Sequence, residues 1–117
     1  MAADDGLIRH VLRPAEWAEA QAAGAIRPPS LAVEGFVHCS TAAQLPGVIA
    51  RFYADIDADE LTILAVDPAG LDVRWEAPAH PDGSPNTTAE AAARFPHVYE
   101  AIPLGAVVTV QRGPAKP

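Results

Sequence analysis

The chain has 117 residues, half of them hydrophobic, a formal net charge of −7 and a sequence pI of about 4.8. This length fits one domain, residues 1–117, whose ordered core we place at about residues 7–112. An acidic surface repels phosphate backbones, so we expect no nucleic-acid partner. The N-terminus lacks the features of a signal peptide and no apolar run approaches membrane-spanning length, which favours a cytoplasmic protein without membrane contact.

Taken in chain order, the first part predicts a strand, a helix and an extended connection. Residues 7–12 alternate like a strand. Pro14 then opens a helix at its first position, residues 15–23 are rich in alanine and glutamate, and Gly24 is the expected C-terminal cap. Two prolines in residues 25–30 favour an extended connection.

The densest chemistry follows in eight consecutive residues, Glu34-Gly35-Phe36-Val37-His38-Cys39-Ser40-Thr41. If they form a short strand, Phe36, His38 and Ser40 point to one side and Cys39 to the other. With Cys39 in the core, the imidazole and the hydroxyl face a groove or solvent. A buried, inert thiol is then the better interpretation of Cys39 than an activated nucleophile, and one cysteine excludes both an intramolecular disulfide and a CxxC motif.

An amphipathic helix is the clearest periodic signal, because apolar residues recur at i, i+3, i+4 and i+7 from residue 45 to residue 52. Residues 41–44 predict a tight turn before it, with Pro46 in the first helical turn. Ser40 and Thr41 would then lie near a helix N-terminus, where free N–H groups favour an anion.

The second half predicts mainly strands. Residues 61–66 are almost wholly apolar and indicate a strand buried on both faces. Residues 73–76 alternate cleanly, with Arg74 and Glu76 on one face. Residues 106–111 form a last strand.

Between these strands lie less regular segments. Residues 55–60 begin like a calcium loop but lack its glycine, so a solvated connection is the better interpretation. Residues 77–84 are proline-rich, which predicts a flexible flap. Residues 88–94 favour a short helix.

Three histidines, His10, His38 and His97, fall in strand or turn segments beside other polar groups. Together with Arg74 they predict a pocket for a small anion, although each ring alone could be structural. Arg74 and Glu76 are equally compatible with a surface ion pair and with an anion-binding and catalytic pair. A zinc site is disfavoured because no paired ligand spacing such as HxxxH appears.

Several motifs carry a resemblance to a known family. They are Glu34-Gly35-Phe36-Val37-His38-Cys39-Ser40-Thr41, Val73-Arg74-Trp75-Glu76 and Phe95-Pro96-His97-Val98-Tyr99. With these motifs the chain resembles the bacterial domain of unknown function number 952, which is distantly similar to the ADP-ribosyltransferase and RNA 2′-phosphotransferase fold group. The resemblance implies an α+β domain in which two small, mostly antiparallel sheets form a cleft with helices outside.

The resemblance also implies roles for single residues. His10 on the first strand, with His38 and Ser40 on the second, would contact a nicotinamide-side ribose or an equivalent ligand. The side walls of the cleft would come from Arg74, Glu76, His97 and Tyr99. Two positions depart from the family: Arg9 replaces an aromatic residue before the first histidine, and Glu100 replaces a glycine after the tyrosine.

Together these expectations describe an enzyme, a transferase of ADP-ribosyl- or phosphotransferase type, that binds a small-molecule anion or nucleotide. His38, Glu76 and His97 would be catalytic. The ligand would be bound by His10, Ser40, Thr41, Arg74 and Tyr99. NAD is a candidate substrate and no metal is expected. The alternatives are a non-catalytic metabolite-binding or accessory module, and motifs that serve folding alone.

Overall fold

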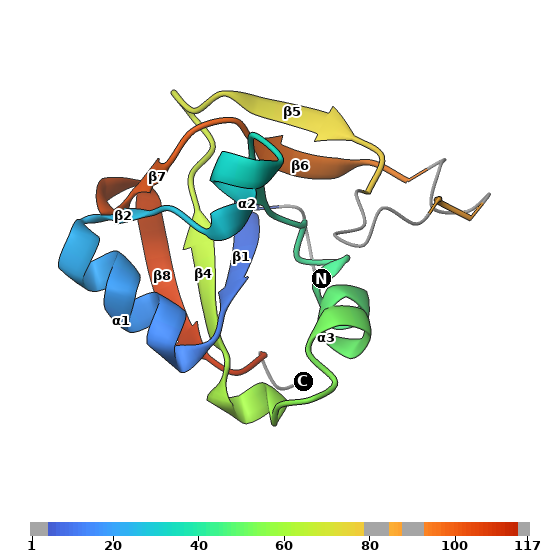
Figure 1. Ribbon diagram of the computed structural model, residues 1–117, viewed down its shortest axis with the longest axis horizontal. Coiled ribbons are helices and arrows are strands. Elements are labelled where there is room, and N and C mark those ends of the chain that lie inside the picture. The colour runs from blue at the N-terminus through green and yellow to red at the C-terminus, as the bar shows by residue number, and fades with distance from the viewer. Residues whose placement is uncertain (1–4, 79–84, 88–92, 115–117) are drawn as a thin grey trace.

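Three antiparallel sheets and three short α-helices make up the part of the chain that the computed structural model describes, residues 5–78, 85–87 and 93–114 (Figure 1). The strands are β1 (Ile8–Leu12), β2 (Ala25–Ile26), β3 (Val37–His38), β4 (Thr62–Val66), β5 (Val73–Glu76), β6 (Phe95–Val98), β7 (Ile102–Pro103) and β8 (Val107–Arg112). The helices are α1 (Pro14–Ala23), α2 (Pro29–Val33) and α3 (Leu45–Phe52), and single 3₁₀ turns occupy Ala58–Glu60 and Leu104–Ala106.

The three sheets have the strand orders β1-β4-β8, β2-β7 and β3-β6-β5. Strand β4 is buried along its whole length, as its apolar sequence predicts, because it is central in its sheet. The expected mixed α+β class is confirmed, but the expected number of two sheets is wrong. The third sheet pairs only Ala25 with Pro103 and Ile26 with Ile102, a ladder too short to leave an alternating pattern in the sequence.

Helix α1 begins and ends where its sequence predicts. Pro14 occupies its first turn, and the Glu16 side chain returns to accept a hydrogen bond from the backbone N–H of Arg13 at 2.7 Å. Gly24 ends the helix with φ of 79°, a left-handed conformation that glycine adopts without a steric penalty. The connection that follows is not wholly extended as expected, because Pro29 opens the five-residue helix α2.

The turn before α3 is also confirmed. The Thr41 N–H donates to Gln44 Oε1 at 2.9 Å, and the Gln44 N–H donates to Thr41 Oγ1 at 3.1 Å. Pro46 lies in the first turn of α3, where its missing N–H leaves no intrahelical bond unmade.

The main core lies where the sheets and α1 meet, and its most deeply buried members include Ile26, Leu64, Val98 and Ile102. Figure 1 shows the sheet β3-β6-β5 above the sheet β1-β4-β8, with α1 and α3 on opposite sides of β1. None of the helices in the described residues is both long enough and apolar enough to cross a membrane. Most of the flap predicted at 77–84 and of the helix predicted at 88–94 lies outside the described residues.

Candidate functional site

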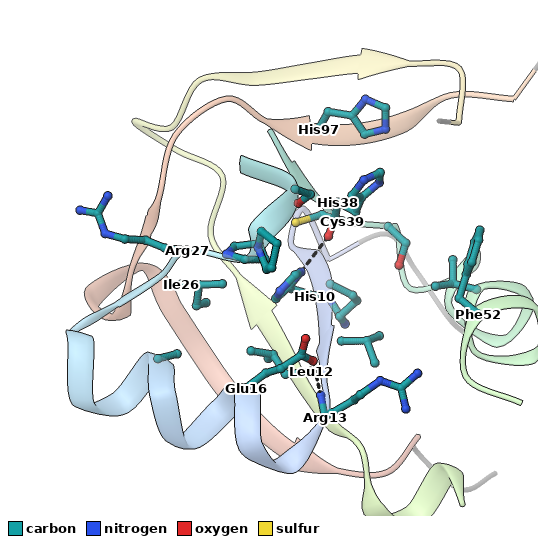
Figure 2. A pocket seen from close by; sticks show the side chains of 18 of the residues that line it. His10, Leu12, Arg13, Glu16, Ile26, Arg27, His38, Cys39, Phe52 and His97 are labelled. Atoms are coloured by element: carbon teal, nitrogen blue, oxygen red, sulfur yellow. Dashed lines mark hydrogen bonds between the residues drawn. The ribbon is translucent and has the colours of Figure 1, made fainter. Parts of the chain in front are cut away.

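A cavity of about 550 Å³ opens between the two larger sheets, with α1, α3 and the segment that joins β2 to α2 around it. Its volume is in the range of pockets that hold small organic ligands. Residues of β1, α1, β2, α2, β3, α3 and β6 line it, and His10 of β1, His38 of β3 and His97 of β6 are among them (Figure 2). Three imidazoles that are far apart in the sequence therefore line one cavity, with His10 at one end and His38 and His97 toward the other.

His10 is held in one orientation at the inner end of the cavity. Its side chain is 7% exposed, and its Nδ1 lies 2.7 Å from the backbone carbonyl oxygen of His38. Because a carbonyl only accepts, Nδ1 carries the proton and donates, which leaves Nε2 as an unprotonated acceptor. Burial lowers the pKa of His10, so the neutral form is favoured.

A backbone bridge fixes the distance between His10 and the chain after β3. The Arg9 N–H donates to the Ser40 carbonyl at 2.7 Å, and the Ser40 N–H donates to the Arg9 carbonyl at 2.8 Å. These two bonds join the sheet of β1 to the segment that carries His38. Ser40 is buried and lines the cavity, as expected for a hydroxyl that faces a groove.

One face of the sheet β3-β6-β5 is polar and aromatic. His38 pairs with His97 and His97 pairs with Arg74 in the register of this sheet, so these three side chains share a face. The two-residue period adds Phe36, Glu76 and Tyr99 to the same face. The alternate row, Val37, Val98 and Val73, faces the core.

His97 and Glu76 form a carboxylate–imidazole pair on this face. His97 Nδ1 lies 2.9 Å from Glu76 Oε1, and the Tyr99 hydroxyl donates to the same oxygen at 2.6 Å. These two bonds lower the pKa of Glu76. Phe36 stacks on the His97 ring with centroids 4.1 Å apart, which contributes to a His97 exposure of only 3%. Burial lowers the pKa of His97 and Glu76 opposes that shift, so His97 presents a neutral ring whose Nε2 is free to accept.

His38 and Glu34 form a second such pair. His38 Nε2 lies 2.6 Å from Oε2 of Glu34, which is four residues earlier in the chain, and the His38 side chain is 38% exposed. The His38 and His97 rings have centroids 5.7 Å apart and meet edge to face at 70°. Two neighbouring imidazoles, each oriented by its own carboxylate, are suited to accept and donate protons across one reacting group.

Three arginines line the cavity, but two of them are already paired. Arg9 binds Asp5 at 2.7 Å, and Arg13 binds both carboxylate oxygens of Asp55 at 3.1 Å. Arg27 makes no ion pair with the described residues, and Figure 2 shows its guanidinium pointing away from His10. The remaining positive charge is therefore at the rim of the cavity.

Two serines contribute hydroxyls that lack partners. Ser30 Oγ and Ser40 Oγ are buried and make no hydrogen bond with any described residue, and both serines line the cavity. A buried hydroxyl without a partner costs about 1–3 kcal/mol. Such groups are suited to a ligand that supplies the missing hydrogen bond.

The remaining residues expected to bind or react occupy other places. Glu76 lies behind His97 and does not line the cavity itself. Thr41 uses its hydroxyl in the turn before α3, so it caps the backbone and does not face the cavity. Arg74 pairs with Asp72 at 3.1 Å and lies 4.1 Å above the Tyr99 ring, and neither Arg74 nor Tyr99 is part of the cavity wall.

The cysteine of the motif is buried at 6% exposure, and burial raises the pKa of its thiol, which agrees with an inert Cys39. Within the described residues, His, Cys, Asp and Glu form no group of three that could hold a metal ion.

Sequence reasoning missed Glu16, Glu34 and Arg27. A sequence signal exists for Glu34, since this carboxylate lies four residues before His38 in the same motif. In the sequence, Glu16 is an ordinary helix-forming residue. Only the position of α1 beside β1 brings it to the cavity. No pattern in the sequence indicates Arg27.

Comparison with known proteins places these residues in a wider group. The family model described as "Protein of unknown function (DUF952)" matches residues 11–110. Protein CC0527 from Caulobacter crescentus has a crystal structure with 31% sequence identity and a TM-score of 0.68, covering 89% of this chain and 82% of that one. Its solution NMR structure gives 29% identity and a TM-score of 0.67, with coverage of 92% and 84%. No functionally curated protein matches this chain.

Proposed function

The chain belongs to the DUF952 family of proteins of unknown function, and from the geometry of its cavity we propose that it is an enzyme acting on a nucleotide-like small molecule. The ligand is an NAD- or ADP-ribose-like compound or another phosphorylated small molecule. His38 and His97 serve as its acid and base. The reaction is a transferase reaction of ADP-ribosyl- or phosphotransferase type, in keeping with the resemblance to that fold group.

One observation carries this proposal: three imidazoles converge on one cavity, and two of them are each bound to a carboxylate. A single histidine at a cavity wall is commonly structural. Two adjacent carboxylate–imidazole pairs on one sheet face are harder to explain by stability, because partly buried charges give little net stabilisation.

The chemistry assigned to these residues is proton transfer during group transfer. His97, neutral because of burial, accepts the proton of an attacking hydroxyl at Nε2 while Glu76 holds Nδ1. His38 donates a proton to the leaving group, and Glu34 orients its ring. Ser40 orients the ligand, and Arg27 at the rim offers charge to a phosphate that extends out of the cavity.

A ligand panel tests binding. NAD, ADP-ribose and ribose 5-phosphate are added in turn, and protein-observed NMR follows the ring resonances of His10, His38 and His97 while thermal unfolding follows stabilisation by binding. We expect at least one compound to shift all three rings and to raise the unfolding temperature. Absence of any response across the panel contradicts the proposal.

Product formation from the bound compound tests catalysis. His38→Ala and His97→Ala should abolish turnover. Arg74→Ala is the control, because Arg74 lies on the same sheet face but outside the cavity wall.

A non-catalytic metabolite-binding module is the second candidate, and one observation favours it. His97 is only 3% exposed, which limits the access of a substrate hydroxyl to its ring. A binding module should bind compounds of the same panel. The wild-type chain should then form no product from them, either with water or with another acceptor hydroxyl.

A further inference from the structure

The part of the cavity between α1 and β1 has apolar walls, with the buried ring of His10 at its inner end and the exposed carboxylate of Glu16 at its mouth. Leu12, Ala20 and Ile26 are buried and line it. Figure 2 shows Glu16 and His10 at the same hollow, with Leu12 and Ile26 beside them. A flat, largely apolar ligand group fits such a space better than a strongly hydrated one.

The two polar groups of this part of the cavity are both acceptors. His10 donates through Nδ1 to the His38 carbonyl, so its Nε2 only accepts. Glu16 uses Oε1 to accept the Arg13 N–H, which holds its carboxylate in place and leaves further lone pairs free. A ligand group that satisfies both must bring N–H or O–H donors.

The charges of this part of the cavity disfavour an anion. Arg9 and Arg13 are each neutralised by an aspartate, and Arg27 points away toward the rim. The carboxylates of Glu16 and Glu19 also line the cavity, and neither makes a salt bridge with a described residue. A phosphate placed between Glu16 and His10 would meet a like charge and an acceptor nitrogen, and neither of these two groups would donate a hydrogen bond to it.

We infer that Glu16 and His10 select the planar, amino-bearing or cationic nitrogen ring of the ligand and reject anionic groups from this part of the cavity. This inference deepens the proposed function, on which it rests only in taking the cavity as the ligand site. The ring of a nucleotide-like ligand would enter first, and its phosphate would remain near Arg27.

Three probes with one ring and different head groups test this selection. Benzamidine is a planar cation with N–H donors, benzamide is neutral with donors, and benzoate is an anion without donors. Affinities are taken from protein-observed NMR titrations that follow His10, Leu12 and Ile26. We expect benzamidine to bind most tightly, benzamide less tightly, and benzoate at least about tenfold more weakly than benzamidine, because a hydrogen bond to a charged group contributes at least that factor.

Two matched variants identify the residue responsible. Glu16→Gln keeps the backbone cap of α1, since glutamine serves at this position as well as glutamate does, and should weaken benzamidine about tenfold while strengthening benzoate. Glu19→Gln removes the same charge from another residue of α1 that lines the cavity, and should leave the order of the three probes unchanged.

Equal binding of benzoate and benzamidine would overturn the inference. The same holds if the His10 resonances do not respond to any probe at 10 mM. An effect of Glu19→Gln on probe affinity as large as that of Glu16→Gln would also overturn it. These outcomes are separate from failure of the proposed function. Loss of turnover or of nucleotide binding concerns His38 and His97, whereas the probes report on the part of the cavity between α1 and β1 alone.

Discussion

Removal of the Ser40 hydroxyl should stabilise the ligand-free protein. Ser40 is 2% exposed, and its Oγ has no hydrogen-bond partner among the described residues. A buried hydroxyl without a partner costs about 1–3 kcal/mol, and loss of one oxygen from packing offsets a part of this. Ser40→Ala should therefore raise the free energy of unfolding by roughly 1 kcal/mol.

Urea unfolding without ligand, followed by far-UV circular dichroism, measures this change. A gain of roughly 1 kcal/mol corresponds to an increase in unfolding temperature of about 4 °C for a domain of this size. Thr41→Ala is the matched control, because the neighbouring hydroxyl accepts the Gln44 N–H at 3.1 Å. Its loss should destabilise the protein by about 0.5–2 kcal/mol.

The two hydroxyl deletions should thus have opposite signs. A loss of stability in Ser40→Ala as large as that in Thr41→Ala would refute the reasoning, since it would mean that the Ser40 hydroxyl is fully satisfied in the ligand-free state. If a panel compound binds, the same Ser40→Ala variant should bind it more weakly. The site would then be shown to sacrifice stability for binding.

Three further outcomes follow from the titrating groups. Glu76→Gln should lower the pKa of His97 further, since burial already lowers this pKa and Glu76 opposes that shift. An NMR titration of the His97 ring resonances measures the pKa, and a higher pKa in the variant would contradict the hydrogen-bonded pair. Burial also lowers the pKa of His10 from 6.5, so its contribution to stability is present above that pH and is lost as the pH falls through the lower folded value. His10→Gln should reduce the loss of stability in unfolding curves between pH 7 and 5, and an unchanged slope would argue against a buried neutral ring. Cys39, whose thiol pKa is raised by burial, should react with a disulfide reagent only at the rate of unfolding, and rapid labelling of the native protein would count against its burial.

Local patterns in the sequence were sufficient for most elements of the fold. The proline at the start of α1, the glycine at its end and the apolar spacing of α3 act within a few residues, so their structural meaning does not depend on distant contacts. The alternation of β5 likewise placed Arg74 and Glu76 on one face before any pairing was known. Such patterns also indicated that His38 and Cys39 have different surroundings, which the buried thiol bears out.

What joins these residues into a site depends on tertiary structure. The bond from His10 to the His38 carbonyl links residues 28 positions apart, and His97 meets Glu76 and His38 only through the register of β6 with its two neighbours. Register is set by packing of the valine row against the core, a contact between segments that no local pattern encodes. The sequence by itself therefore determined the elements and the candidate side chains, whereas non-local packing decided that His10, His38 and His97 share a cavity while Arg74 and Tyr99 lie outside it.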